Sequence, residues 1–223
     1  MNPIFRVIAR MTENNVDMTY ISYNHMHKLC QQSAVKLREA GKMPDIIVAI
    51  SGGGLIPARM LRTFLKKENG GKNIPIQAIG LSLYEDLGTD DFQQVIGKQV
   101  VKTQWLDLDI INERFGTLLG KKILIVDEVD DTRTTLAYAL EELEKEVELA
   151  KESQPEKQHL DTEFSVFVLY NKLKPKKKQL PDYIMDQGRY IVASAVNDSW
   201  LCFPYDSTDI DLHTQRATEQ GNI

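Results

Sequence analysis

Cysteines and long hydrophobic runs are scarce in this sequence, and each absence excludes a class of protein. Among its 223 residues there are only two cysteines, Cys30 and Cys202. Two thiols without close spacing form neither a disulfide framework nor a zinc site. We therefore expect two reduced thiols in a cytoplasmic protein, with a nuclear location also open. The longest apolar runs, such as 46–50 and 123–126, are far too short to span a bilayer, so no membrane association is expected.

The sequence also lacks an excess of positive charge. Its 27 Lys and Arg residues are outnumbered by 32 Asp and Glu residues, which gives a net charge of −5 with His neutral. Non-specific binding to a phosphate backbone requires a cationic surface, so no nucleic-acid partner is expected. The apolar fraction of 42% is enough for a buried core, and the length fits one sizeable α/β domain or two small ones.

Hydrophobic spacing predicts strands and helices that alternate along the chain. The predicted helices cover residues 22–40, 56–67 and 136–147, and the predicted strands cover 45–50, 74–83, 122–126 and 164–170. Between them we expect a loop at 84–94, an antiparallel hairpin arm within 95–106, a charged linker at 151–162 and a solvated lysine-proline loop at 172–178. This alternation predicts right-handed βαβ units and hence a mostly parallel sheet flanked by helices.

A run of acidic and hydroxyl residues follows the strand predicted at 122–126. Such a turn, at the carboxyl end of a parallel strand, faces the crevice where doubly wound sheets bind ligands. The backbone N–H groups of residues 132–135, at the start of the next helix, would bind a phosphate, and Asp127 and Glu128 would accept hydrogen bonds from a sugar diol. The alternative is that residues 130–132 only cap the helix, but a cap leaves the two preceding acids unexplained.

The run over residues 123–136 resembles the phosphoribosyl-pyrophosphate signature of type I phosphoribosyltransferases: an apolar strand, an acid pair, an apolar spacer, Asp-Thr and Thr-Thr. Over residues 20–215 the chain is similar to the fungal hypoxanthine-guanine phosphoribosyltransferases in particular. The matching segments are, in order, 20–24, 51–54, 56–59, 61–65, 81–87 and 103–105.

The resemblance implies the type I phosphoribosyltransferase fold, an α/β fold with a central, mostly parallel sheet flanked by helices and a small hood formed by terminal segments. We divide the chain into an N-terminal extension at 1–18, the phosphoribosyltransferase domain at 19–215 and a C-terminal tail at 216–223. The N-terminal and C-terminal parts of the domain would contribute the hood.

The same resemblance assigns the residues that would bind phosphoribosyl pyrophosphate. Asp127 and Glu128 would hold the ribose hydroxyls, and Asp131 would lie near N7 of the purine as the catalytic general acid/base. The residues expected around the 5′-phosphate are Thr132, Arg133, Thr134 and Thr135, and those of the pyrophosphate loop are Ser51, Gly52 and Gly53. Without the resemblance, the glycines fit a plain tight turn as well as a phosphate-binding loop, and both stay open.

The usual signature has glycine at the position of Arg133. The fungal members also have another residue in place of that glycine. The Arg133 side chain could point to solvent or add positive charge near the phosphate, and both orientations stay open at this point.

The resemblance also implies a purine pocket and a closing loop. Ser82 and Tyr84 match the start of the loop that would exclude water from the reaction centre. The residues expected to bind the purine are Lys172, Trp200, Leu201 and Asp206. Lys172 would reach the exocyclic O6, Trp200 would stack on the base, and Leu201 would offer backbone contacts to its edge.

The implied reaction is Mg²⁺-dependent transfer of the phosphoribosyl group from phosphoribosyl pyrophosphate to N9 of hypoxanthine or guanine, a 6-oxopurine base. The products are pyrophosphate and a nucleoside monophosphate. The substrate's own hydroxyls and pyrophosphate would hold most of the Mg²⁺ coordination, with Asp206 close by. Two alternatives stay open: a xanthine phosphoribosyltransferase, and a regulator that binds phosphoribosyl pyrophosphate without turnover. The resemblance also suggests a homodimer.

Overall fold

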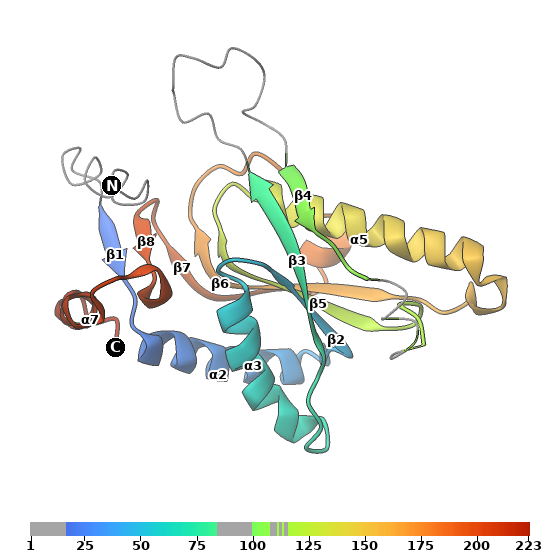
Figure 1. The fold of residues 1–223 in the computed structure, drawn as a ribbon, viewed down its shortest axis with the longest axis horizontal. Coiled ribbons are helices and arrows are strands. Elements are labelled where there is room, and N and C mark those ends of the chain that lie inside the picture. The colour runs from blue at the N-terminus through green and yellow to red at the C-terminus, as the bar shows by residue number, and fades with distance from the viewer. Residues whose placement is uncertain (1–16, 84–99, 108–110, 112, 114–115) are drawn as a thin grey trace, which may run out of the picture.

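The strand that precedes the acidic run lies inside a six-stranded sheet. The computed structural model describes residues 17–83, 100–107, 111, 113 and 116–223. The sheet has the strand order β4-β3-β2-β5-β6-β7 (Figure 1). Its strands are β2 (Ile46–Ile50), β3 (Ile76–Leu83), β4 (Val100–Gln104), β5 (Lys122–Asp130), β6 (Glu163–Lys172) and β7 (Tyr190–Val196). Neighbouring strands are parallel except β4, which pairs antiparallel with β3 at the edge.

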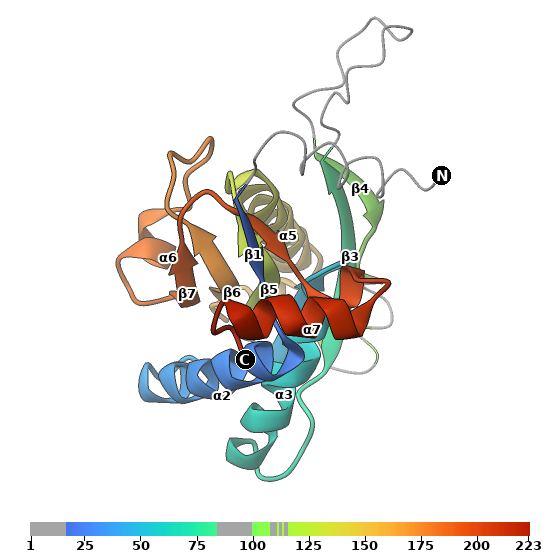
Figure 2. The same ribbon diagram turned by 90° about the vertical axis from the view of Figure 1, so that its left-hand side faces the viewer.

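Alternate side chains of the central strands face two hydrophobic clusters. On one face, Ile47 and Ala49 pack with α2 (Tyr23–Glu39) and α3 (Leu55–Glu68). On the other face, Val48 belongs to the cluster that includes α5 (Thr134–Ser153) and α6 (Asp182–Met185). Figures 1 and 2 show α2 and α3 on one side of the sheet and α5 on the other. The expected α/β architecture is therefore confirmed.

A second, smaller sheet joins the two ends of the described chain. β1 (Met18–Tyr20) pairs parallel with β8 (Trp200–Cys202), with Met18 opposite Trp200. α7 (Ile210–Glu219) lies beside this pair (Figure 2). We call β1, β8 and α7 the hood, and its composition confirms that terminal segments form it.

Most predicted elements are confirmed with small shifts of their ends. The helix predicted at 22–40 is α2, and the Ser22 hydroxyl oxygen accepts a hydrogen bond from the His25 N–H at its start (3.1 Å). A strand does lie within the arm predicted at 95–106, because β4 pairs with β3. Residues 95–99 and the loop predicted at 84–94 lie outside the described residues.

Two element predictions are wrong in their extent. β5 does not end at Val126 but continues to Asp130, because β6 runs beside it and pairs Asp130 with Asn171. The charged linker predicted at 151–162 instead begins with the last turn of α5, and Pro155–Lys157 forms a 3-10 helix.

The predicted boundary at residue 215 falls inside α7, so residues 216–219 are helix rather than tail. The chain end beyond the helix also packs on the hood, where the Asn222 side-chain amide donates to the Tyr20 carbonyl (2.9 Å). At the other end, residues 1–16 of the predicted extension lie outside the described residues, but the Trp200 N–H donates to the Asp17 carbonyl (2.7 Å). Hydrogen bonding to the hood thus extends past the predicted boundary at both ends.

Both cysteines are free thiols, as expected. Burial raises the pKa of Cys30 to about 12, so this thiol is a packing residue rather than a nucleophile. Within the described part of the chain, no helix has the length and apolar character needed to cross a membrane.

Candidate active site

Two glycines allow the turn after β2 to lie directly against the end of β5. A Cβ atom at Gly54 would lie 2.5 Å from the Ile50 carbonyl oxygen and 2.6 Å from the Val126 carbonyl oxygen. A Cβ atom at Gly53 would overlap the Glu128 carboxyl group. The predicted pyrophosphate loop is therefore in contact with the predicted ribose-binding acids. Gly52 has a φ of 90°, a conformation that favours glycine, and the described peptide bonds are all trans.

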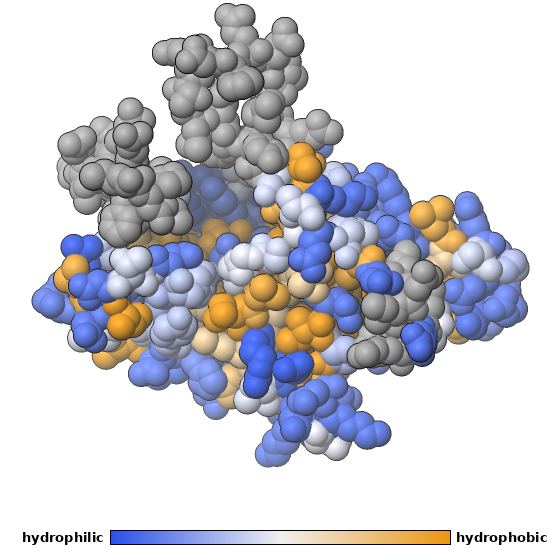
Figure 3. All heavy atoms as spheres, viewed as in Figure 1, coloured by the Kyte–Doolittle hydropathy of each residue, from blue (hydrophilic) through white to orange (hydrophobic). Residues whose placement is uncertain are grey.

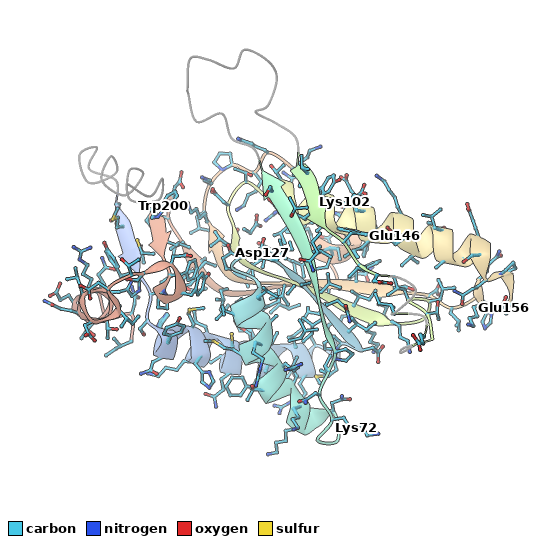
Figure 4. All side chains as sticks on the ribbon, in the orientation of Figure 1. Lys72, Lys102, Asp127, Glu146, Glu156 and Trp200 are labelled. Atoms are coloured by element: carbon cyan, nitrogen blue, oxygen red, sulfur yellow. The ribbon has the colours of Figure 1, made fainter. Side chains whose placement is uncertain are left out.

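Three carboxyl groups gather where β5 approaches the hood. Burial and the Glu128 carboxylate raise the pKa of Asp127 well above its ordinary value. Burial and the same Glu128 carboxylate also raise the pKa of Asp206, which ends the 3-10 helix Pro204–Asp206. One acidic group therefore contains Asp206, expected from the sequence beside the purine, together with the acid pair Asp127 and Glu128. Asp127 lies near the centre of the molecule in Figure 4.

Tyr205 faces this acidic group, although no pattern in the sequence distinguishes it. Its buried hydroxyl has no hydrogen-bond partner among the described residues. Burial, followed by the carboxylates of Glu128, Asp206 and Asp127, raises the pKa of the Tyr205 phenol. An unpartnered hydroxyl beside mutually repelling carboxylates is suited to a ligand that brings positive charge or hydrogen-bond donors.

A hard divalent cation fits these oxygen ligands. However, the described residues contain no cluster of three or more His, Cys, Asp or Glu side chains arranged to hold a metal ion. Glu128 and Asp206 could therefore supply part of a coordination shell whose remaining ligands come from a bound molecule.

The start of α5 offers backbone donors to an anion. The helix begins at Thr134, and no side chain caps it. The first N–H groups of a helix have no partner within the helix, and the helix dipole adds partial positive charge there. The hydroxyl groups of Thr132 and Thr134 lie 3.0 Å apart beside these amides. The side chains of residues 130–132 bond to Arg133, Tyr190, Lys174 and Thr134 and not to the first amides of α5, so the capping alternative is wrong. The phosphate assignment of these amides stays a prediction.

Arg133 takes neither of the two orientations considered from the sequence. Its side chain is only 7% exposed and turns inward. Its Nε donates to the Asp130 carboxylate (2.9 Å), and its guanidinium lies 5.0 Å from the centroid of the Tyr190 ring. Because the guanidinium is occupied in this way, only the main chain of Arg133 is placed to contact a phosphate.

The predicted general acid/base belongs to a cluster of two acids and two lysines. Asp131 is about half exposed and forms an ion pair with Lys174, while the Lys172 Nζ lies 3.7 Å from the same carboxylate oxygen. Asp198 accepts from Lys174 (2.9 Å) and lies 3.4 Å from the Lys172 Nζ. The Lys174 hydrogen bond lowers the pKa of Asp198. The structure therefore brings together Asp131 and Lys172, which lie far apart in sequence.

Lys174, Lys176 and Asp198 are site residues that the sequence interpretation missed. The prediction of a solvated loop at 172–178 is wrong for Lys174 and Lys176. The Lys176 ammonium is nearly buried and donates to the carbonyls of Asp130 (2.7 Å), Asp131 (2.9 Å) and Lys172 (2.9 Å). A usable signal existed, since these residues follow β6 and β7, and the carboxyl ends of parallel strands meet at one edge of a sheet.

The remaining predicted residues lie on the hood and on β3. Trp200 is 41% exposed on β8 (Figure 4), so its ring is free to stack on a flat ligand. Leu201, the next residue of the strand, is buried. Ser82 lies in β3 opposite Val101. Tyr84 lies outside the described residues, so the closing loop stays a prediction.

Known proteins share the sequence of this chain over most of its length. The family model for the phosphoribosyl transferase domain matches residues 21–180. The chain is 56% identical over 212 residues to Xanthine phosphoribosyltransferase 1 of Saccharomyces cerevisiae, covering 95% of this chain and 100% of that protein. It is 50% identical over 205 residues to the hypoxanthine-guanine phosphoribosyltransferase of Schizosaccharomyces pombe, covering 92% and 96% respectively.

A solved structure is similar over the same extent. A hypothetical protein from Neisseria gonorrhoeae, crystallised with bound ppGpp, superposes with a TM-score of 0.71 at 35% identity. The match covers 92% of this chain and 98% of that one.

Proposed function

This chain belongs to the phosphoribosyl transferase domain family, and from that membership we propose that it is a purine phosphoribosyltransferase of nucleotide salvage. It transfers the phosphoribosyl group of phosphoribosyl pyrophosphate to N9 of hypoxanthine or guanine and releases pyrophosphate. One observation carries the proposal: the acid pair at the end of β5 lies in contact with the glycine turn and is followed within a few residues by the uncapped start of α5.

The substrate fits this arrangement group by group. Asp127 and Glu128 accept hydrogen bonds from the ribose hydroxyls, and the N–H groups of 132–135 bind the 5′-phosphate. The Glu128 carboxyl group fills the space that a side chain at Gly53 would take, whereas no described atom lies within 4 Å of a Cβ position at Gly52, so the backbone of the turn is open to the leaving pyrophosphate there. Positioning of the two reactants accounts for most of the rate enhancement in such a transfer.

The purine is held by the acid and lysine cluster. The Lys172 ammonium donates to O6, which favours a 6-oxopurine over a 6-aminopurine, whose own N–H donors would face it. Asp131 lies beside Lys172 and holds or accepts a proton at N7 while N9 forms the new bond. Trp200 stacks on the base from the hood.

Mg²⁺ is part of the proposal. The site residues that would contribute to holding it are Glu128 and Asp206, and when bound it supplies neutralising charge for the pyrophosphate. The raised pKa of Asp206 beside Glu128 supports a cation at this place, because a cation would relieve the repulsion between the two carboxylates.

A xanthine phosphoribosyltransferase is the second candidate function. The observation that favours it is the 56% identity to the Saccharomyces cerevisiae protein of that name. Both candidates use the same acid pair, phosphate turn and acid/base, and they differ only in contacts to the 2-position of the base. The non-catalytic regulator has no such support, because Asp131, Lys172 and Trp200 are all in place.

The decisive experiment is a transferase assay with purified protein, Mg²⁺, phosphoribosyl pyrophosphate and each of hypoxanthine, guanine, xanthine and adenine. We expect IMP and GMP, and no AMP. XMP as the dominant product would replace the first candidate with the second, and no product from any base would overturn the enzyme.

Asp131→Asn tests the role of the general acid/base. The substitution keeps the shape of the side chain and removes its ability to take a proton, so kcat falls about 100-fold or more. The KM for phosphoribosyl pyrophosphate changes by less than about threefold, because the acid pair and the phosphate turn are unchanged. Loss of substrate binding with kcat preserved would reassign Asp131 to binding.

The proposal includes a homodimer in the cytoplasm. The apolar side chains of α3 support a second copy as partner, because Leu55 is exposed and Ile56, Met60 and Phe64 are only partly buried. Figure 3 shows hydrophobic residues gathered on this face of the molecule. Sedimentation of the purified protein tests the dimer, and microscopy of the tagged full chain tests the location.

A further inference from the structure

The turn between β5 and α5 contains an unusual backbone conformation. Arg133 has a φ of 67°, and among the described residues no other non-glycine residue has a positive φ. This left-handed conformation costs an ordinary residue roughly 1 kcal/mol or more, so it persists only where surrounding contacts enforce it.

Two side chains, those of Asp130 and Tyr190, enforce it from inside the molecule. The Asp130 carboxylate is 1% exposed and accepts from the Arg133 Nε (2.9 Å) and from the Tyr190 hydroxyl (2.5 Å). The Tyr190 ring also lies against the Arg133 guanidinium. A buried ion pair that shares its carboxylate with a phenol is well partnered, and removing one member leaves a buried charge or dipole without its partner.

The lysine-proline loop at 172–178 fixes the turn between β5 and α5 from the other side. The carbonyls of Asp130 and Asp131 accept from the Lys176 ammonium, and the Thr132 carbonyl accepts from the Lys177 N–H (3.0 Å). The Arg133 carbonyl accepts from the Ala137 N–H in the first turn of α5 (3.0 Å). All four consecutive carbonyls are therefore held by hydrogen bonds.

This arrangement fixes the direction of the amide groups as well. In a trans peptide the N–H points away from the preceding carbonyl, and the described peptide bonds are trans. Because the carbonyls of residues 131–133 are held, the N–H groups of residues 132–134 are held pointing the opposite way. Those are amides assigned to the 5′-phosphate.

We propose that Asp130, Arg133, Tyr190 and Lys176 are positioning residues that hold the phosphate-binding turn in its binding geometry before the substrate arrives. The Arg133 side chain thus acts on the phosphate through the backbone and makes no contact with it. The inference rests on the proposed function, since it identifies how that site binds phosphoribosyl pyrophosphate.

Tyr190→Phe is the mildest test, because it removes one hydroxyl and keeps the ring against the guanidinium. We expect the KM for phosphoribosyl pyrophosphate to rise about fivefold, with kcat and the KM for the purine within about twofold of the wild type. Titration calorimetry with phosphoribosyl pyrophosphate alone should show the same fivefold weakening without any turnover.

The matched control is Tyr183→Phe. The Tyr183 hydroxyl also donates to a carboxylate, that of Glu144, and an arginine, Arg189, lies 5.9 Å from its ring centroid. This pair lies on α6 and α5, outside the phosphate-binding turn. We expect a comparable change in Tm and no change in either KM. A Tyr190→Phe variant with the kinetic constants of this control would overturn the proposal.

Arg133→Gly separates the side chain from the backbone conformation. Glycine adopts a φ of 67° without strain, so the turn would be unaffected if only the conformation mattered. We expect instead a KM for phosphoribosyl pyrophosphate raised about tenfold, because the contacts to Asp130 and Tyr190 are lost. An unchanged KM in Arg133→Gly would contradict the role of the guanidinium.

The two proposals can fail separately. Wild-type protein that binds phosphoribosyl pyrophosphate but makes no nucleotide would overturn the proposed function, while the calorimetric comparison of the variants would still decide the positioning role. Wild-type protein that binds no phosphoribosyl pyrophosphate would overturn both.

Discussion

Asp127 occupies a position in the folded protein that opposes its own ionisation. Burial and the neighbouring Glu128 raise its pKa well above 3.8, the ordinary value. The folded state therefore binds protons more tightly at this group than the unfolded state does. The stability of the fold should fall as the pH rises from about 4 through the raised pKa, because the charge must then be kept in a buried site.

Asp127→Asn removes this cost. We expect the variant to have a higher free energy of unfolding than the wild type at neutral pH, and a smaller dependence of that free energy on pH above about pH 4. Urea unfolding at a series of pH values measures both quantities. Phosphoribosyl pyrophosphate should bind more weakly to the variant, because Asn offers one acceptor oxygen where the carboxylate offers two.

The Asp127 carboxylate accepts a hydrogen bond from the Glu128 N–H (2.9 Å), and an Asp127→Asn protein less stable than the wild type at neutral pH would show that this bond outweighs the cost of the buried charge. The matched control is Asp45→Asn, since Asp45 lies at the opposite end of the same sheet and accepts from the Lys122 N–H (2.8 Å). Its carboxylate is hydrogen-bonded at an exposed position, so this substitution should destabilise the protein slightly or leave it unchanged.

At the scale of elements, the glycine turn packs closely against β5, and two of its glycines have different roles. Gly54 is needed for folding, and Gly53 is needed for the proposed ribose site. Gly54 faces backbone carbonyls that cannot move without disturbing two strands. We expect Gly54→Ala to lower the free energy of unfolding by about 1–3 kcal/mol, as overpacking typically does. Chemical denaturation measures this change.

Gly53→Ala should behave differently, because the added Cβ meets a side chain rather than backbone. The Glu128 carboxyl can rotate away, so the stability changes less than in Gly54→Ala. The same rotation displaces an acid from the proposed ribose site, so the KM for phosphoribosyl pyrophosphate should rise severalfold. Equal losses of stability in the two variants would contradict this distinction.

The elements themselves follow from the sequence to differing degrees. The spacing of apolar residues predicts α2, α3, α5 and the parallel strands β2, β3, β5 and β6, because each has a strong local pattern. It misses β1 and β8, which are three residues long and exist through their pairing with each other. It also stops β5 too early, since polar residues continue a strand when a neighbouring strand pairs with them.

At the scale of the whole molecule, the C-terminus holds the N-terminal strand of the hood in place. The Gln220 side chain accepts from the Tyr20 N–H (2.7 Å) and donates to the Met18 carbonyl (2.9 Å). The Ser22 N–H donates to the Asn222 carbonyl (3.2 Å). Because β1 in turn pairs with β8, these bonds support the strand that carries Trp200.

Truncation after Glu219 removes these hydrogen bonds. We expect the KM for the purine to rise severalfold while the KM for phosphoribosyl pyrophosphate stays within about twofold, because the hood carries Trp200, the proposed base-stacking residue, and the sheet carries the proposed phosphate-binding turn. Steady-state kinetics with each substrate varied in turn measures the two constants.

Gln215→Ala is the control for the truncation. Among the described residues the exposed Gln215 side chain bonds only to Glu219, on the same helix, so neither KM should change. A truncated protein with an unchanged KM for the purine would show that the hood is held by its other contacts, such as the bond between the buried His213 ring and the Ile21 carbonyl.

The sequence alone determined the fold class and the contiguous part of the site. Periodicity identifies buried strands and helices, and the run 127–135 contains the acids, hydroxyls and helix start that a phosphorylated sugar requires within a few residues of one another. These residues can be identified from the sequence because they lie next to one another along the chain.

Only the tertiary structure decided the orientation of Arg133 and the membership of Tyr190, Lys174, Lys176, Asp198 and Tyr205 in the site. These residues come from separate strands and loops, and their roles depend on which side chains the sheet order places together. The direction of a long charged side chain depends on whether a buried partner lies within reach. For Arg133 that partner is Asp130, fixed inside the molecule by the pairing of β5 with β6, and no pattern in the sequence carries that information.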